Sequence, residues 1–489
     1  MRMSKQIRLE DWASHWGADT PVRLSSQCEP VGRAKRRRIA LVLAASLCLS
    51  AIFFTDLTGL AQPATQSPAT TTAARNAALI AATAEVLKET SEIRELPILR
   101  PVQSSTQSRA EIERMLIKNL DEETTPAQIH ATEVTLKKLG LVPADFQYRA
   151  LMLRLLTEQV AGYYDPRAQQ FHLADWIDLD GQKPVMAHEL THALQDQHFN
   201  LRRFEHWPKG DSDAELAAHA LIEGDATLAM TLYVTRNPLR ALAFLKSLGA
   251  SGMSSDELNR APRALRETLL FPYQEGILWT RHLYQRGGWN EVSQAFTALP
   301  QSTEQVMHSE KYFAHEAPVK VTLPDIGPIL NHTGRVAVRS IPPAVADGSR
   351  TQAAWKKLDS DVNGEWGFYL ILDQFLKSPG ESRRAAAGWG GDRYSIYEGP
   401  KGEVLFVDLS TWDTENDARE FFDAYVRRTH VRYASAIPVE PTPDTESLAR
   451  TFRTSQGTVS IERRGPRVLV VEGIPDQMNS NSIAKSLWQ

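Results

Sequence analysis

The sequence predicts an α+β fold, in which a mainly helical domain with a small β-hairpin is followed by a small α+β domain. Apolar residues recur at helical spacing over most of residues 74–299. Short segments in which apolar and polar residues alternate, as in strands, interrupt this pattern once, near residue 165. Such segments return only in the last third of the chain. The 489 residues, of which 42% are hydrophobic, suffice for two or three domains with a sizeable core. The net charge of -4 gives no reason to expect a nucleic-acid partner.

The N-terminal segment has the pattern of a targeting sequence. Residues 33–38 form a basic cluster, and an apolar run follows directly over residues 39–54. This run is short for a transmembrane helix but suits a signal-peptide core or a short anchor. We therefore expect residues 1–61 to direct export to the periplasm, either as a cleaved signal peptide or as an inner-membrane anchor through residues 39–54. Both cysteines, Cys28 and Cys48, lie in this leader, so a later metal site must use histidine and carboxylate ligands.

The composition changes at two further places. Residues 62–75 are rich in Pro, Ala, Thr and Ser and predict a flexible linker. Helical patterning continues to about residue 319, where Pro, Gly and short β-like pieces replace it. We place a domain boundary at residues 333–334, so that residues 76–333 form one domain and residues 334–489 form a second, α+β domain.

The hairpin and the helices are predicted from local patterns. The hairpin strands are residues 160–165 and 169–174, joined by a turn at Asp165-Pro166-Arg167. Pro184 then opens a helix that carries the most informative motif of the chain. Other helices of the first domain are expected at residues 74–96, 110–120, 126–139, 145–159, 213–234, 237–248, 255–270, 273–286 and 290–299. The second domain is expected to contain helices at residues 366–376 and 415–428 and strands at residues 394–397, 403–409, 458–463 and 467–472.

The motif is His188-Glu189-Leu190-Thr191-His192. Histidines at i and i+4 share one face of a helix, so His188 and His192 can bind one metal ion. Zinc accepts imidazole nitrogens at about 2.0–2.1 Å. Glu189 would lie beside a water molecule activated by zinc and remove its proton. Small and apolar residues flank the motif, which is unusual for histidines on an exposed helix. We therefore expect a Zn²⁺ site with Glu189 as the general base.

A third metal ligand is expected from the helix at about residues 213–234. Glu215, His219 and Glu223 lie one turn apart on one stripe of this helix. A carboxylate or an imidazole among Ala and Leu residues is costly to bury without a partner. Glu223 is the preferred ligand, because Gly224 leaves room for a close approach, and His219 is the alternative.

Two further kinds of group complete the expected site. Ligand histidines need an acceptor on their other ring nitrogen, and Asp196 and Asp225 are the candidates. Peptide hydrolysis also needs a group that stabilises the oxyanion, and Tyr273 and His308 are the candidates. The alternative role for Tyr273 is that of an aromatic core residue.

These features resemble known metallopeptidases. An HExxH helix followed by a helix that supplies a glutamate is similar to the active-site arrangement of gluzincins, the thermolysin-like metallopeptidases. A group of exported bacterial proteins described as zinc metalloproteases is more similar still, over about residues 160–312. The similarity lies in an ordered series of short motifs at residues 161–165, 187–196, 223–226, 271–276, 287–289, 302–308 and 311–312. One departure is Thr227, which stands where gluzincins carry an acid one turn after the ligand.

The resemblance implies a zincin-like fold and a zinc-dependent hydrolase, in the first instance a peptidase with a peptide or protein substrate. In the resembling peptidases an edge strand before the active helix pairs with extended substrate, which here would be the hairpin of residues 160–174. Two alternatives stay open: a zinc hydrolase of a cell-wall amide, and a non-catalytic envelope interaction protein stabilised by metal. Glu189 favours an enzyme, because a structural metal site needs no general base.

Overall fold

The computed structural model describes residues 68–159, 162–176, 179–207, 210–242, 256–336, 354–439 and 448–488. The leader expected at residues 1–61 lies outside this part of the chain, and so does the end of the helix expected at residues 237–248. Among the described residues, none of the helices combines the length and the apolar character of a membrane span. The first described helix, α2 (Pro68–Arg94), begins inside the segment expected to be a linker, which corrects that expectation for residues 68–75.

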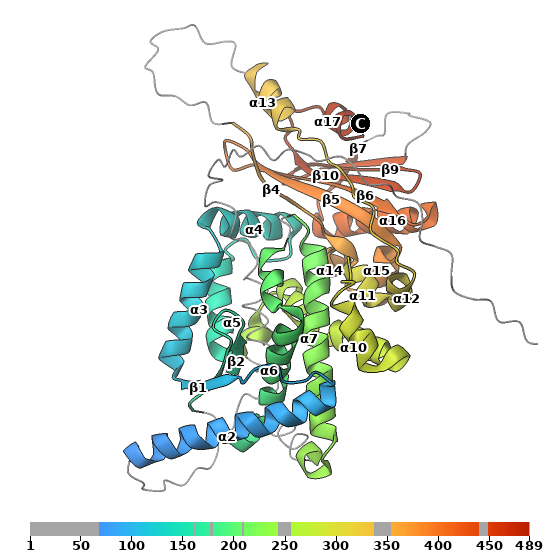
Figure 1. Ribbon diagram of the computed structural model, residues 1–489. Coiled ribbons are helices and arrows are strands. Elements are labelled where there is room, and N and C mark those ends of the chain that lie inside the picture. Colours follow the sequence, from blue (N-terminus) through green and yellow to red (C-terminus); the bar gives the residue numbers. More distant parts are fainter. Residues whose placement is uncertain are drawn as a thin grey trace, which may run out of the picture. The chain divides into compact units, whose positions relative to one another are not determined.

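The first region of the chain is mainly helical (Figure 1). Its other helices are α3 (Arg109–Glu123), α4 (Pro126–Leu139), α5 (Tyr148–Gln159), α6 (Leu179–Phe199), the 3₁₀ helix η2 (Leu201–His206), α7 (Ser212–Thr235), α9 (Asp256–Arg260), α10 (Arg263–Ala295), α11 (Thr303–Met307) and α12 (Ser309–Phe313). Local signals explain several of their ends. Ser108 and Thr125 each form a capping box at the start of α3 and α4. Gly140, with a φ of 73°, ends α4 in the left-handed conformation.

Two of these helices are longer than their local sequence predicts. The helix α6 begins at Leu179 and contains Pro184, which was expected to open it. The helix α10 continues through Pro272, and its backbone leaves helical geometry only at Gly287 and Gly288. A proline inside a helix removes one hydrogen bond and crowds the preceding turn. Packing of these helices in the core therefore outweighs the local cost at both prolines.

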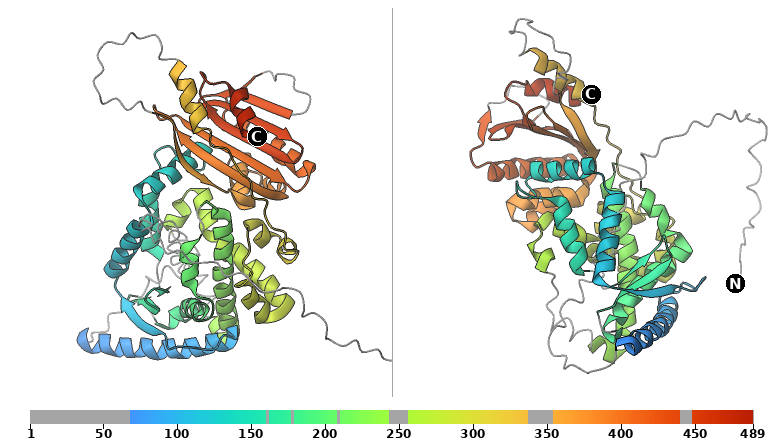
Figure 2. Two further views of the ribbon diagram at one scale, coloured as in Figure 1. Left: turned by 45° about the horizontal axis from the view of Figure 1, so that its top comes forward. Right: turned by 90° about the vertical axis from the view of Figure 1, so that its left-hand side faces the viewer.

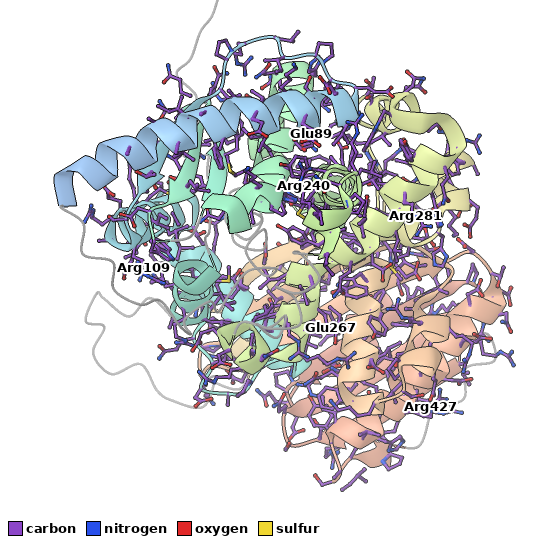
Figure 3. The ribbon with its side chains drawn as sticks, turned by 90° about the horizontal axis from the view of Figure 1, so that it is seen from below. Glu89, Arg109, Arg240, Glu267, Arg281 and Arg427 are labelled. Atoms are coloured by element: carbon purple, nitrogen blue, oxygen red, sulfur yellow. The ribbon has the colours of Figure 1, made fainter. Side chains whose placement is uncertain are left out.

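The helix α2 packs against the helices that follow it. Its residues Leu79, Val86 and Leu87 are buried in the main hydrophobic core. Beyond the end of α7, Arg240 forms a two-pronged ion pair with Glu89 of α2, with N–O distances of 3.0 and 3.1 Å (Figure 3). This ion pair fixes α2 across the end of α7.

A small sheet precedes α6. Strands β2 (Gly162–Asp165) and β3 (Gln170–Ala174) form the expected hairpin, in which Tyr163 lies opposite His172. A further strand, β1 (Gln103–Gln107), pairs in parallel with β3, so that the order is β1-β3-β2. The sequence of β1 is Gln-Ser-Ser-Thr-Gln and contains no apolar residue, so it gives no strand pattern.

The C-terminal region contains a seven-stranded sheet of order β4-β5-β6-β10-β9-β8-β7, and its neighbouring strands are antiparallel. The strands are β4 (Lys356–Asp361), β5 (Trp389–Glu398), β6 (Val404–Trp412), β7 (Ile437–Val439), β8 (Leu448–Thr454), β9 (Gly457–Arg464) and β10 (Arg467–Ile474). The helices are α13 (Gly327–Val336), α14 (Gly364–Leu376), α15 (Pro379–Ala386), α16 (Glu415–Arg432) and α17 (Ser480–Leu487). Both helices and all four strands expected here are present, although their bounds differ.

Helices cover both faces of this sheet (Figure 2). Side chains alternate along a strand, so neighbouring residues of β6 belong to different cores. Phe406 packs in the main core that includes α14 and α16, whereas Leu405 and Val407 pack with residues of α13 and α17. The runs of apolar residues in β6 and β10 reflect this burial on both faces.

The helix α13 moves the expected domain boundary. It runs through residues 333–334, where the boundary was placed. Its residue Leu330, and Ile326 just before it, are buried with the C-terminal sheet rather than with the first region. The C-terminal region therefore begins before Ile326. The structure is of the α+β class, as expected.

Candidate metal centre

The helices α6 and α7 bring three expected ligands together. His188 and His192 lie one turn apart on α6, and Glu223 lies on α7, which packs beside α6. All three side chains are buried. Burial of two imidazoles and a carboxylate is costly unless they bind one another or a metal ion.

The donor atoms of the three residues converge on one point. The distance between His188 Nε2 and His192 Nε2 is 3.1 Å, and Glu223 Oε2 lies 3.2 Å from the first and 3.6 Å from the second. Ligands at about 2.0–2.1 Å from a tetrahedral centre lie roughly 3.3–3.4 Å apart. The observed spacings bracket that value, so the two nitrogens and one oxygen are spaced as the corners of one face of a zinc coordination tetrahedron would be. The donor set therefore fits zinc.

Electrostatics tie Glu223 to the histidines. Burial opposes the charged form of His192, but Glu223, Glu189 and Gln195 together outweigh burial and raise the pKa of His192 to about 9. Conversely, burial would raise the pKa of Glu223, but His192 and His188 hold it far below its usual range. The two histidines thus favour the anionic form of Glu223, which is the form that binds metal.

The partner of the other His192 nitrogen is Gln195. Its Oε1 lies 2.9 Å from His192 Nδ1, while its Nε2 donates to Ile222 O at 3.0 Å and to Asp225 Oδ2 at 2.9 Å. Two acceptors fix the amide orientation, so Oε1 must accept a proton from Nδ1. His192 Nε2 is then the ring nitrogen that faces Glu223 and His188, and it is the one that a metal ion would bind.

Asp225 contacts Gln195 and not one of the candidate ligand histidines. It was a candidate acceptor for a ligand histidine, but it binds the Gln195 amide instead. Its other oxygen lies 2.5 Å from Arg94 Nε, and both side chains are fully buried. The guanidinium of Arg94 also stacks on Trp289, 4.5 Å from the ring centroid. The chain Arg94–Asp225–Gln195–His192 thus connects α2 to the metal centre.

Asp196 has a different role from the one expected. It accepts hydrogen bonds from Tyr164 Oη at 3.0 Å, from Arg100 at 2.9 Å and from the backbone of Leu201 at 3.1 Å. These bonds fix β2 and the segments before and after α6. Asp196 is therefore a structural acceptor and does not bind a ligand imidazole.

Glu189 lies beside the edge of the small sheet. It is buried on α6, and its Oε2 accepts a hydrogen bond from the backbone N–H of Tyr164 in β2 at 3.0 Å. This bond orients the carboxylate from the side of β2.

His219, the alternative third ligand, is buried one turn before Glu223 but is outside the cluster of converging donors. Burial lowers the pKa of His219 to about 4, so this imidazole is neutral. Within the described residues, His219 Nδ1 has no hydrogen-bond partner. The geometry therefore favours Glu223 as the ligand.

The two candidate oxyanion groups differ in position. The ring of Tyr273, on α10, stacks on His188 with 6.2 Å between ring centroids, which places it beside the metal centre. His308 instead binds Glu365 of α14, with Nε2 2.9 Å from the carboxylate, and that bond raises the pKa of His308. These contacts make His308 a link to the C-terminal region and do not support its expected role at a reacting carbonyl.

A second group of carboxylates, Glu304, Glu316 and Asp413, also lies close enough together to hold a metal ion. Lys311 occupies its centre, with Nζ 2.7 Å from Glu304 and 2.6 Å from Glu316. An ammonium already supplies the positive charge there, so this group is an ion-pair network.

Comparisons with known proteins concern the other end of the chain. A family model described as a domain of unknown function, DUF8575, matches residues 351–483. This stretch begins just before β4 and ends in α17, so it covers the C-terminal sheet and leaves α6 and α7 outside. None of the curated proteins and none of the solved structures matches the chain.

Proposed function

We propose that the protein is a zinc-dependent hydrolase that cleaves peptide bonds. The observation that carries the proposal is the convergence of His188, His192 and Glu223 on one point at tetrahedral spacings. A second observation is Glu189, next to the first ligand in the chain and held by Tyr164 without joining the donor set. The resemblance of residues 160–312 to zinc metalloproteases and to the gluzincin arrangement supports the same function and a zincin-like fold.

Each residue has a distinct task in this proposal. His188, His192 and Glu223 would hold the zinc ion, and Gln195 keeps His192 in the tautomer that can bind it. Zinc, when bound, lowers the pKa of a water molecule to about 7 and polarises a carbonyl group. Glu189 accepts the proton of the attacking water and passes it to the departing amine. Tyr273, whose ring stacks on His188, would donate a hydrogen bond to the oxyanion.

The substrate would approach along the small sheet. Strand β2 is an edge strand, and because its Tyr164 N–H is already bonded to the Glu189 carboxylate, a substrate would pair with its other backbone groups. An extended peptide that pairs with such an edge is held by backbone hydrogen bonds, which tolerate many sequences. The proposal therefore takes an unfolded or extended protein segment as the substrate.

Replacement of Glu189 by Gln tests the function. Gln keeps the size and the hydrogen bond from Tyr164 but cannot accept a proton, so turnover should fall by about 10²–10⁴-fold. Elemental analysis should still find about one zinc per chain in Glu189→Gln, but not in His192→Ala. Peptide-library cleavage followed by mass spectrometry measures the activity.

The matched control is Glu113→Gln, which changes an exposed carboxylate on α3 and should cleave as the wild type does. Undiminished cleavage by Glu189→Gln would contradict the proposed mechanism. Zinc without cleavage of any peptide, in the wild type, would favour a hydrolase of a cell-wall amide or a metal-stabilised interaction protein.

A further inference from the structure

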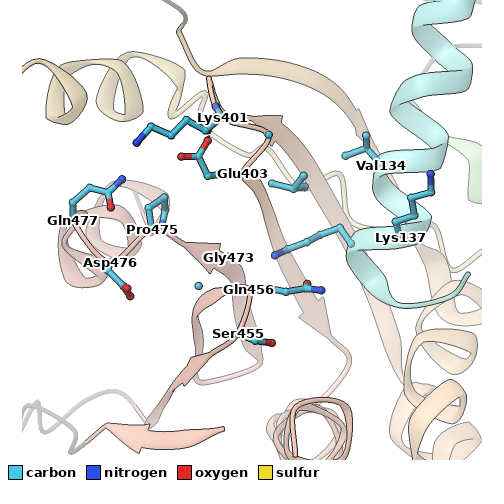
Figure 4. Close-up of a pocket in the computed structure, with 14 residues that line it drawn as sticks. Val134, Lys137, Lys401, Glu403, Ser455, Gln456, Gly473, Pro475, Asp476 and Gln477 are labelled. Atoms are coloured by element: carbon cyan, nitrogen blue, oxygen red, sulfur yellow. Dashed lines mark hydrogen bonds between the residues drawn. The ribbon is translucent and has the colours of Figure 1, made fainter. Parts of the chain in front are cut away.

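A cavity of about 580 Å³ lies where α4 meets the C-terminal sheet (Figure 4). Its walls are the last turns of α4, the turn between β5 and β6, the turn between β8 and β9, and the end of β10. This volume is within the range of about 300–1,000 Å³ that is typical of small-molecule sites. None of its lining residues belongs to the metal centre.

Lys138 places an ammonium group in this cavity. The residue lines the cavity, yet its side chain is only 6% exposed. It reaches over Gly473, where an added Cβ would lie 2.3 Å from Lys138 Nζ. Gly473 has a φ of +94°, so the absence of a side chain leaves the space that the ammonium occupies. Among the described residues, none forms a hydrogen bond or an ion pair with Lys138 Nζ.

Glu472, the carboxylate whose charge acts on Lys138, is already bound to other groups. Glu472 accepts from Arg432 at 2.9 Å and from Tyr425 at 2.5 Å, and it also binds Arg428. Three buried cations, those of Lys138, Arg428 and Arg432, therefore share the single carboxylate of Glu472. A buried charge without a partner is unfavourable, so the buried cluster of Lys138, Arg428, Arg432 and Glu472 has an excess of positive charge.

The pKa of Lys138 reflects the imbalance. Burial lowers the pKa of Lys138 to about 8. The positive charges of Arg432 and Arg428 act in the same direction, and the Glu472 carboxylate acts against them. Near neutral pH the group is still mainly protonated. An anion placed in the cavity would stabilise that charged form.

Other lining groups add hydrogen-bond donors. Gln456 uses its Oε1 to accept from Arg432 at 3.3 Å and from Tyr433 at 3.1 Å, so its amide NH₂ remains a donor. Lys401 lies on the exposed rim. The carboxylate of Glu403, another lining residue, is turned to its own loop and accepts from the backbone of Lys401 at 2.8 Å.

We propose that this cavity binds a small organic anion, whose carboxylate or phosphate group pairs with the Lys138 ammonium. The proposal does not depend on the function of the metal centre.

Thermal unfolding of the full-length protein tests it. Sodium acetate or sodium phosphate at roughly 10 mM, compared with sodium chloride at equal ionic strength, should raise the Tm of the wild type by about 2–4 °C. Acetate and phosphate in separate experiments distinguish the two acidic groups. Lys138→Met, which keeps the length but not the charge, should lose the rise, whereas Lys401→Met on the rim should keep it.

Two further variants make the result decisive. His188→Ala should respond to the anion as the wild type does, which excludes binding at the metal centre. If Lys138→Met does not fold, Gln456→Leu is used in its place. Gln456 is exposed, and its replacement removes the second hydrogen-bond donor of the cavity. The absence of a rise with both anions, or an equal rise in Lys138→Met, would overturn the proposal.

Discussion

Gln195 controls which nitrogen of His192 is free to bind a metal. Its amide is held by Ile222 O and Asp225, so only its oxygen can face His192 Nδ1. Arg94 in turn holds Asp225 through a buried ion pair. Partners behind metal ligands commonly change metal affinity by 10–100-fold. The orientation of His192 therefore depends on a residue of α2, about a hundred positions earlier in the chain.

Replacement of Gln195 by Met should weaken zinc binding by about 10–100-fold, because Met keeps the volume but offers no acceptor to Nδ1. Competition with a chelator measures the affinity. The control is Gln197→Met on the same helix, since Gln197 binds only the backbone of residues 99 and 100. Equal zinc affinity in Gln195→Met and the wild type would show that the Gln195 amide does not orient His192.

The sequence predicts the three converging side chains of the candidate site better than the residues that support them. The i, i+4 spacing fixes a shared helix face, so His188 and His192 could be paired without a structure. For the supporting acceptor, the sequence points to the acids Asp196 and Asp225, whereas the structure has Gln195 at i+3 from His192, next to Asp196 at i+4. Both positions lie near the ligand face, and only the neighbouring helix decides between them. Asp225 on α7 orients the Gln195 amide, which local sequence cannot show.

At the scale of elements, α7 and α10 cross at two glycines. A Cβ on Gly224 would lie 2.3 Å from the carbonyl oxygen of Gly276, and a Cβ on Gly276 would lie 2.4 Å from that of Ala220. The backbones therefore touch where the chain also carries Glu223. The glycine predicted to give Glu223 room serves this helix contact.

Replacement of Gly224 by Ala should destabilise the protein although Ala favours helix formation by about 1 kcal/mol. The reason is that a backbone oxygen at 2.3 Å cannot move without separating α7 from α10. Chemical denaturation measures the free energy of unfolding, and we expect a loss of about 1–3 kcal/mol, typical of overpacking. The control is Gly380→Ala in α15, where the nearest atom is 3.8 Å away and stability should not fall. A more stable Gly224→Ala would contradict the close crossing.

Elements with their own sequence pattern could be predicted, and those built by packing could not. The β2–β3 hairpin follows from alternation and its Asp-Pro turn. Strand β1 has only polar residues and owes its position to pairing with β3. The continuity of α10 through Pro272 likewise depends on its burial against α7.

At the scale of the whole molecule, a buried charge network joins α4 of the helical region to the C-terminal region. Arg428 donates to Leu139 O at 2.8 Å, and Arg432 donates to Lys138 O, so two arginines of α16 bind the last carbonyls of α4. Both arginines also bind Glu472 of β10. Glu472 is therefore the counter-charge that allows α16 to cap α4.

This network predicts a loss of stability in acid. Burial would raise the pKa of Glu472, but Arg428 and Arg432 outweigh it and lower the pKa from 4.5 to about 2. A carboxyl with a lowered pKa stabilises the fold above pH 4.5, and that stabilisation decreases as the pH falls from 4.5 toward 2. The shift corresponds to about 3 kcal/mol.

The variant Glu472→Gln isolates this contribution. At pH 7 its free energy of unfolding should be lower than that of the wild type by about 3–5 kcal/mol, because Arg428 loses its buried partner. The variant should therefore unfold at a lower denaturant concentration. The difference from the wild type should shrink between pH 4.5 and 2. Asp392, whose pKa burial raises to about 6, changes stability in the opposite sense, but it is present in both proteins and cancels in the comparison. A constant difference over this pH range would contradict the lowered pKa of Glu472.

The capping of α4 also affects the order in which contacts can form during synthesis on the ribosome. The bonds from Arg428 to Leu139 and from Arg432 to Lys138 span 289 and 294 residues. The end of α4 is synthesised long before its partners, since translation proceeds at about 5–20 residues per second. For at least roughly 15 seconds, the nascent chain must therefore keep the last turn of α4 exposed or cover it in another way. Contacts of such long range form late and leave incomplete folding intermediates open to aggregation.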